Sequence, residues 1–299
     1  MIIVDLEAHF LTLEFADYIR ITSETRGLPR GSGQEIFDLG KGRLKAMDEA
    51  GIDKSVVLPL DPLTITNFDE AISLDQLTKI FVEAARRHPK RIIAFVGIDP
   101  RRQNAAKFLV KAVNEYGVKG LKIHPCFGFY PNDKYCYLLY EKAEELKIPV
   151  LCHTGPEIFP LYSKYARPVY LDDVANDFPD LKIIIAHAGS CWFEEAISIA
   201  NNKLNIYLDV SWWQPRLFKN PIEEFYKPLR RLIDNVGSNK VLFGSDWPAL
   251  RQVRRLPHSA WVKAFTEIPV ELKEAGIEFK DDEIKRILGE NAASILNLA

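Results

Sequence analysis

Glu7 and His9 stand two residues apart in the apolar stretch IIVDLEAH (2–9). On a β-strand, residues i and i+2 share a face, so a carboxylate and an imidazole would converge on the interior side. Such nitrogen and oxygen donors suit a divalent transition metal rather than calcium, which takes oxygen ligands. His153 and Asp246 follow later apolar runs and would complete the set. We predict one divalent metal ion, Zn²⁺ or Mn²⁺, held by Glu7, His9, His153 and Asp246, although each residue alone could be a hydrogen-bonded core group.

His187 lies in the small-residue turn AHAGS, where neighbouring groups can approach closely. An imidazole with an ordinary pKa of about 6.5 can both take and give a proton at neutral pH. We therefore predict that His187 is a general acid/base next to the metal, with a fifth-ligand role as the alternative. Asp246 is predicted to have a second, catalytic role, because a carboxylate at the metal can also take or deliver a proton.

Four further residues are candidates for substrate binding. Lys122 and His124 end the run VKGLKIHP (118–125), where a cation and an imidazole could contact a substrate carboxylate. A structural role for His124 is an equal alternative. Phe127, just after the run 118–125, and Trp247, near the end of the run 240–249, could line a pocket for an aromatic substrate, but aromatic residues are also common in cores.

These residues need elements that bring them together. Short apolar runs rich in β-branched residues alternate with amphipathic stretches such as LDQLTKIFVEAARRHP and WFEEAISIANNK. That alternation predicts parallel strands with helical crossovers, an α/β fold in which eight units close into a (β/α)8 TIM barrel. Catalytic groups of such barrels lie at the carboxyl ends of the strands. The eight predicted strands lie in residues 2–9, 54–60, 91–100, 118–125, 148–155, 181–190, 204–212 and 240–249.

The ends of the chain and its longest connection complete the expected architecture. The segment DDEIKRILGENAASILNL (281–298) is predicted to be a C-terminal helix that closes the barrel. No linker or repeat divides residues 1–299, so we expect a single catalytic domain. The long connection 10–43 contains RGLPRGSGQ and is interpreted as a possible lid over the active site.

Bulk composition favours a small-molecule partner. The chain has 299 residues, 47% hydrophobic, and a formal net charge of −2, which argues against a nucleic-acid-binding face. No apolar run approaches about 18 residues, so no membrane span is predicted, and the start lacks the basic segment of a signal peptide. The four cysteines show no disulfide-scaffold spacing, which favours reduced thiols and a cytoplasmic location. We also expect a homo-oligomer, a dimer or a tetramer.

Several motifs carry a family resemblance. PDLKIIIAHAGS, NIYLDVS, VLFGSDWP and ILGENAASIL resemble, in this order, the last three strands and final helix of the amidohydrolase superfamily. The resemblance is to its amidohydrolase-related branch, which includes aminocarboxymuconate-semialdehyde decarboxylase and the dihydroxybenzoate decarboxylases. It implies one catalytic divalent metal, with the ligand roles falling on Glu7, His9, His153 and Asp246. It also implies a catalytic role for His187.

The reaction type stays open at this point. Many members of the branch carry His-x-His on the first strand, whereas this chain has Glu7-x-His9, which resembles the benzoate-type decarboxylases. In contrast, GLKIHP and LCHTG resemble the branch's hydrolases. We expect non-oxidative decarboxylation of a small aromatic or unsaturated carboxylate, with hydrolysis of an ester, lactone or amide as the alternative. A dinuclear site bridged by a carboxylated Lys122 and a non-catalytic ligand-binding barrel are remote alternatives.

Overall fold

A computed structural model describes residues 1–9, 40–61, 72–157, 161–217, 221–247 and 257–298. All of its strands pair in parallel, in the order in which they follow along the chain. Every predicted strand region contains one strand or, in one case, two segments. The strands are β1 (Val4–Ala8), β2 (Lys54–Val57), β3 (Ile92–Ala94), β4 (Val96–Gly97), β5 (Leu121–Ile123), β6 (Val150–Cys152), β7 (Ile183–Ile185), β8 (Ile206–Asp209) and β9 (Val241–Leu242).

Backbone hydrogen bonds join these strands into a closed ring. β3 and β4 form one extended stretch that is interrupted at Phe95, whose N–H donates to Val57 O on β2 at 3.1 Å. Across the seam, Leu6 N–H donates to Phe243 O at 3.0 Å and His9 N–H donates to Trp247 O at 2.7 Å. The last strand is therefore hydrogen-bonded to the first, and the predicted TIM barrel is confirmed.

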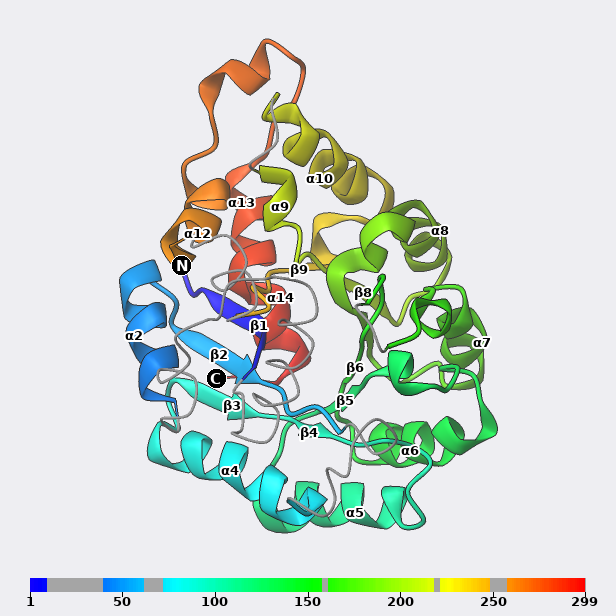
Figure 1. Ribbon diagram of the computed structural model, residues 1–299. Helices are drawn as coiled ribbons and strands as arrows, with labels where there is room; N and C mark the ends of the chain where they lie inside the picture. The colour runs from blue at the N-terminus through cyan, green and yellow to red at the C-terminus, as the bar shows by residue number, and fades with distance from the viewer. Residues whose placement is uncertain (10–39, 62–71, 158–160, 218–220, 248–256, 299) are drawn as a thin grey trace.

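Helices surround the strands, as Figure 1 shows. Their sequences have the predicted amphipathic spacing, and α4 (Leu74–Arg87) also begins with a capping box in which Ser73 and Gln76 exchange hydrogen bonds. Its buried side chains face the strands. The other helices of the described chain are α2 (Lys41–Ala50), α5 (Ala105–Lys111), α6 (Lys134–Glu145), α7 (Tyr170–Asp177), α8 (Phe193–Asn202), α9 (Gln214–Leu217), α10 (Glu223–Val236), α12 (His258–Thr266), α13 (Asp281–Lys285) and α14 (Asn291–Ile295).

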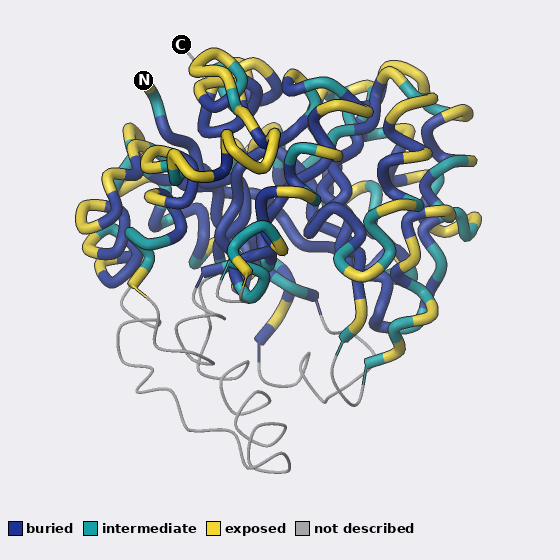
Figure 2. The backbone as a smooth tube through the Cα atoms, turned by 90° about the horizontal axis from the view of Figure 1, so that it is seen from above, coloured by how far each residue is buried: buried dark blue, intermediate teal, exposed yellow. Residues whose placement is uncertain are grey.

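Two apolar cores lie on the two faces of the strands. The larger one packs helices against the outside of the barrel, and the smaller one fills the interior with residues such as Leu6, Phe95 and Ile184. Figure 2 shows the buried strands at the centre and exposed residues on the outer helices. Because apolar side chains occupy the deep interior, the polar residues at the strand ends have a rigid base.

The C-terminal segment closes the barrel, as predicted, but not as one regular helix. A π-helical stretch, Arg286–Glu290, separates α13 from α14. It sets Gly289 against the first residues of the chain, where an added Cβ would lie 2.1 Å from Ile2 O. Ala292 and Ile295 of α14 join the interior core. Because Gly289 has no Cβ, this π-helical stretch can lie close to the start of the chain. A larger residue at position 289 would prevent that approach.

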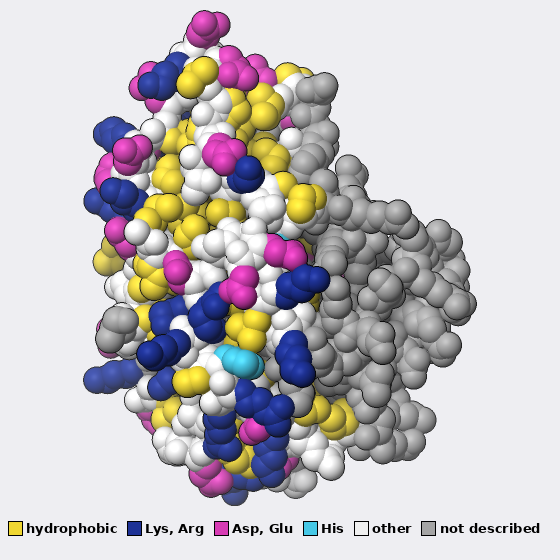
Figure 3. Space-filling model, turned by 90° about the vertical axis from the view of Figure 1, so that its left-hand side faces the viewer, with side chains coloured by type: hydrophobic (Ala, Val, Ile, Leu, Met, Phe, Trp, Pro, Cys, Tyr) yellow, Lys and Arg dark blue, Asp and Glu magenta, His cyan; other side chains and the backbone are white. Residues whose placement is uncertain are grey.

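The face seen in Figure 3 mixes basic and acidic side chains. Ion pairs on the surface of the described chain include Arg87 with Glu83 and Arg91 with Asp48. None of the helices in the described residues is both long and apolar enough to cross a membrane. Most of the predicted lid, residues 10–39, lies outside the described residues, while its last residues, 41–43, belong to α2.

Candidate metal centre and active site

The carboxyl ends of the strands bring the predicted polar residues into one region. A register shift in β1, between Asp5 and Ala8, changes the simple alternation of its side chains. Asp5 pairs with Arg43 on α2, outside the ring of strands, whereas Glu7 contacts Lys122 of β5 across the interior. Because the strand is irregular here, the side chains of Asp5 and Glu7 face different partners, although only two positions separate them.

Glu7, His9 and Asp246 form one potential metal group, with donor atoms within 4.8 Å of one another. His9 Nε2 lies 3.1 Å from Asp246 Oδ1 and 3.8 Å from Glu7 Oε1. His9 Nδ1 lies 2.8 Å from Leu58 O. Because a carbonyl oxygen only accepts, Nδ1 carries a proton, and Nε2 is the nitrogen that faces the two carboxylates.

This arrangement fits a divalent cation. In a neutral His9 the Nε2 lone pair would face the Asp246 oxygen directly, so either a second proton or a cation must lie between them. Burial opposes the second proton, but the Asp246 carboxylate outweighs burial and raises the pKa of His9. The same electrostatic preference for positive charge at this point suits a metal ion, and the donors are those that zinc and manganese accept.

Glu7 is held by a dense set of buried partners. Lys122 Nζ lies 2.5 Å from Glu7 Oε1, and Ser211 Oγ donates to Glu7 Oε2 at 2.7 Å. Burial raises the pKa of Glu7, yet the Lys122 ammonium and His187 outweigh it, so the pKa falls well below its ordinary value. For Asp209, burial and the Glu7 charge raise the pKa well above its ordinary value. Of the two carboxyl groups, Glu7 is therefore the one whose surroundings favour the ionised form.

His187 is connected to the same set through Ser211. Its Nδ1 lies 2.8 Å from Ser211 Oγ, and its Nε2 lies 3.2 Å from His153 Nδ1. Ser211 Oγ also lies 2.7 Å from Glu7 Oε2 and 2.5 Å from Asp209 Oδ2, so one hydroxyl links the His187 ring to both carboxyl groups. His187 Nε2 and His153 Nδ1 lie within hydrogen-bond distance, so one proton can be held between the two rings.

Strained backbone places several of these side chains. His187 (φ 58°) and Ala188 (φ 43°) after β7, and Asp246 (φ 53°) after β9, have left-handed conformations that are uncommon for residues other than glycine. Hydrogen bonds compensate at these turns, for example Asp246 N–H to Glu7 O at 2.8 Å and Trp213 Nε1–H to His187 O at 2.7 Å. Such strain concentrates at functional sites, where the fold holds a side chain in one direction.

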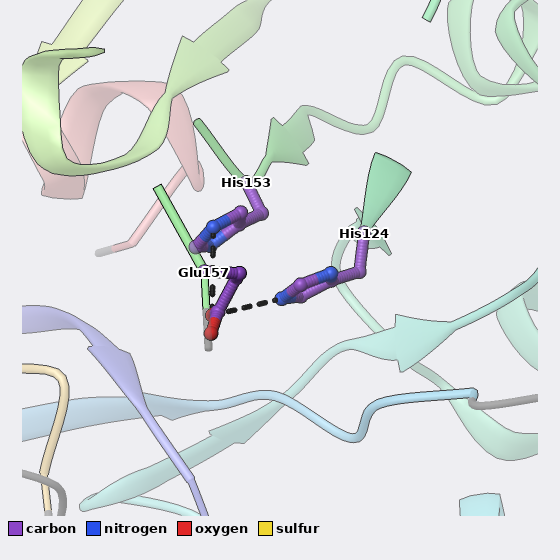
Figure 4. Close-up of side chains that lie close together, drawn as sticks. All are labelled: His124, His153 and Glu157. Atoms are coloured by element: carbon purple, nitrogen blue, oxygen red, sulfur yellow. Dashed lines mark ion pairs between the residues drawn. The ribbon is translucent and has the colours of Figure 1, made fainter. Parts of the chain in front are cut away.

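His153 falls in a different potential metal group from the other three predicted ligands. Its partners there are His124 and Glu157, as Figure 4 shows. Glu157 Oε1 lies 3.6 Å from His153 Nε2 and 3.5 Å from His124 Nε2. Glu157 was not among the site residues predicted from the sequence. The signal was its place in HTGPE, four residues after His153 in the turn beyond β6, where a carboxylate can fold back towards a strand-end histidine.

The predicted substrate-binding residues are all buried around the site. The ammonium of Lys122 is paired with Glu7, and His124 packs against Phe127 with ring centroids 4.6 Å apart. Lys122, His124 and Phe127 line a cavity of about 10 Å³, roughly the space of one water. Trp247 is 3% exposed, and the Arg43 guanidinium lies 5.5 Å from its ring centroid. Contact of these four residues with a substrate stays a prediction.

Solved structures with similar folds were found across the full chain. A TIM-barrel protein from Bordetella bronchiseptica is 21% identical with a TM-score of 0.73, covering 99% of each chain. A 5-carboxyvanillate decarboxylase from Novosphingobium aromaticivorans, bound to manganese and 3-methoxy-4-hydroxy-5-nitrobenzoic acid, is 16% identical with a TM-score of 0.73, covering 99% of this chain and 97% of that one. A 2,6-dihydroxybenzoate decarboxylase from Rhizobium is 18% identical with a TM-score of 0.70, covering 100% and 99%.

Comparison at the level of sequence gives the family. A search of curated proteins found no match. The family model described as amidohydrolase matches residues 13–298, nearly the whole chain apart from β1. The strand-end carboxylates and histidines described above, the barrel and this match agree: the chain belongs to the amidohydrolase family.

Proposed function

We propose that the protein is a metal-dependent decarboxylase that acts on a small aromatic or unsaturated carboxylate. The observation that carries the proposal is the cluster of Glu7, His9 and Asp246 at the carboxyl ends of β1 and β9. The similarity to decarboxylases solved with bound manganese, one of them with 3-methoxy-4-hydroxy-5-nitrobenzoic acid and one with the inhibitor 2-nitroresorcinol, supports the reaction type. Residues 1–299 would act as a single catalytic domain.

We propose Glu7, His9, His153 and Asp246 as the residues that hold the cation, Mn²⁺ or Zn²⁺. When bound, such a cation would attract a substrate carboxylate and an adjacent oxygen and withdraw electron density from them. The chain's own groups then prepare the site. Lys122 and Ser211 keep Glu7 ionised and fixed, and the Leu58 carbonyl holds the His9 ring in one orientation. This preorganisation lowers the cost of binding a charged ligand.

In the reaction, the bond between the substrate carbon and its carboxylate breaks, CO₂ leaves, and the carbon takes up a proton. We propose His187 as the proton donor, with Asp246 as the second candidate. Ser211 engages His187 Nδ1, so a proton would be held or transferred at Nε2, which lies 3.2 Å from His153 Nδ1 and would exchange that contact for the substrate. Between turnovers the imidazole would regain its proton from water. Lys122, His124, Phe127 and Trp247 are proposed to surround the substrate.

A hydrolase is the second candidate, favoured by the resemblance of GLKIHP and LCHTG to hydrolases of the same branch. In that reaction, Asp246 would take a proton from the attacking water, and the same residues would bind the metal.

We further propose a cytoplasmic protein that forms a homodimer or homotetramer and has a small-molecule partner rather than nucleic acid or membrane.

The deciding experiment is a substrate screen with the manganese-loaded enzyme. CO₂ release would be measured over hydroxybenzoates and unsaturated dicarboxylates, in parallel with hydrolysis of esters and lactones. We expect CO₂ release from at least one hydroxybenzoate, abolished in Asp246→Asn. Hydrolysis without CO₂ release would replace the decarboxylase proposal by the hydrolase. Binding of metal with neither activity would favour a non-catalytic barrel.

A further inference from the structure

The turn that carries Phe127 is held by a neighbouring loop. It is a 3₁₀ turn, Pro125–Phe127, directly after β5, and the Phe127 ring packs against His124 with centroids 4.6 Å apart. Arg101, in the loop between β4 and α5, donates through Nη2 to Phe127 O at 3.0 Å and through Nη1 to Gly128 O at 3.3 Å. One guanidinium therefore binds two successive carbonyl groups of this turn.

The Arg101 side chain is in turn fixed by a buried carboxylate. Asp99 is 1% exposed, and its two oxygens accept from Arg101 Nε at 2.8 Å and from Arg101 Nη2 at 2.5 Å. The Asp99 backbone N–H donates to Asp61 Oδ2 at 2.7 Å. Because a planar guanidinium matches both oxygens of a carboxylate, this pairing gives Arg101 one orientation relative to its own loop.

The backbone of the turn leaves room for this guanidinium. Gly128 has φ 112°, a left-handed conformation that favours glycine, and an added Cβ would lie 3.3 Å from Arg101 Nη1. The guanidinium carbon lies 5.3 Å from the centroid of the Phe129 ring. Phe127 and Phe129 both line the small cavity beside the strand ends, and so does Asp99. The contacts of Arg101 therefore lead directly to the predicted substrate site.

We propose that Arg101 is a positioning residue for substrate binding, which holds the Phe127 ring in place as a wall of the substrate site. It acts through the turn, because its nitrogens bind Asp99 and the two carbonyl groups. This role rests on the proposed function, in which Phe127 lies against an aromatic or unsaturated substrate. A ring that is already held in place binds such a substrate without the cost of ordering the turn.

The first test measures the turn itself and needs no substrate. Hydrogen exchange would be compared for peptides covering residues 125–129 in the natural protein and in Arg101→Gln. We expect exchange in this segment to become about fivefold faster or more, because the turn loses two hydrogen bonds. Arg87→Gln, which removes an exposed arginine that is paired with Glu83, is the matched control and should leave it unchanged. Unchanged exchange in a folded Arg101→Gln would refute the positioning role.

The second test separates positioning from direct action on the substrate. Arg101→Gln should raise KM by about tenfold and change kcat by less than about threefold, because a displaced ring weakens binding throughout the reaction. Arg101→Lys keeps the charge without the planar fork and should show the same defect. In a Phe127→Ala background, Arg101→Gln should raise KM no further, because both changes act through one ring.

Two kinetic results would contradict the role. A fall in kcat at constant KM, or a normal KM in Arg101→Lys, would mean that the guanidinium acts on the substrate itself. Should Arg101→Gln fail to fold by circular dichroism, Gly128→Ala disturbs the same turn with Arg101 present, and faster exchange and a higher KM are again expected.

Failure of the proposed function would be recognised separately. If the natural protein hydrolyses esters and releases no CO₂, the decarboxylase proposal fails, and KM for the ester decides the role of Arg101. If the natural protein shows no turnover, hydrogen exchange at residues 125–129 alone decides whether Arg101 holds the turn.

Discussion

Polar groups are buried both at the seam of the barrel, where β1 meets β9, and at the ends of β5 and β6, but they are paired differently. At the seam, Asp5 accepts from the Ser245 backbone N–H at 2.8 Å and from Ser245 Oγ at 2.5 Å, and it forms an ion pair with Arg43. At the ends of β5 and β6, His124 Nδ1 and His153 Nε2 have no hydrogen-bond partner.

This difference indicates that the seam serves as structural framework, whereas the ends of β5 and β6 serve as a binding site. Arg43 also donates through Nε to Ser55 Oγ at 3.0 Å and lies 3.2 Å from His258 Nε2, so together with Asp5 it has three polar partners at the seam. Ser245 Oγ in turn accepts from Trp247 N–H at 3.1 Å, which orients the turn that carries Asp246. The dense pairing around Asp5 and Arg43 thus makes the seam rigid, while the unpaired His124 Nδ1 and His153 Nε2 on the other side can bind a ligand.

The largest effect is expected at the seam. Arg43→Ala would leave the Asp5 carboxylate buried without its cation, and the free energy of unfolding should fall by about 3–5 kcal/mol. Urea denaturation measures this. Arg87→Ala removes an exposed pair with Glu83 and should cost no more than about 0.5 kcal/mol. Similar losses in the two variants would show that the seam has no special structural role.

The variant His187→Asn tests whether His187 transfers a proton or binds the metal. If His187 transfers a proton and does not bind metal, turnover should fall by roughly a hundredfold or more with the cation content unchanged. Activity assays and elemental analysis of the same sample would be compared. Loss of the cation together with the imidazole would instead make His187 a ligand.

A smaller effect is expected from Ser211→Ala, which breaks the link between Glu7, Asp209 and His187. Without the hydroxyl, His187 loses the partner that orients its ring, and we expect turnover to fall by about tenfold. The Michaelis constant should change little, because Ser211 acts through His187 and Glu7. A rise in the Michaelis constant at constant turnover would indicate direct substrate contact instead.

The smallest change is expected in the pH dependence of stability. Burial raises the pKa of Asp5, but Arg43 and His258 outweigh it, so the pKa lies below its ordinary value of 3.8. A lowered folded-state pKa contributes stability above pH 3.8 that is lost as the pH falls through the folded value. The deficit of Arg43→Ala should therefore shrink below pH 3.8 in denaturation curves. A constant deficit down to pH 2 would contradict this assignment.

Much of the framework could be predicted from the sequence because its causes are local. Apolar runs of strand length and amphipathic stretches of helix length recur along the chain, and each predicted strand region contains a strand. Parallel strands then place their carboxyl ends on one face, which accounts for the convergence of Glu7, His9 and Asp246. The family followed from motifs that are contiguous in the sequence.

Only the tertiary structure decided how those groups are paired. Glu7 meets Lys122 over a separation of 115 residues, because the register of β1 shifts between Asp5 and Ala8, whereas Asp5, which lies before the shift, pairs with Arg43. Glu157 joins His124 and His153 because an anchored turn folds back over β6, which no periodic pattern indicates. Side-chain period and strand order follow from neighbouring residues, whereas contacts across the barrel depend on closure, bulges and turns that form together.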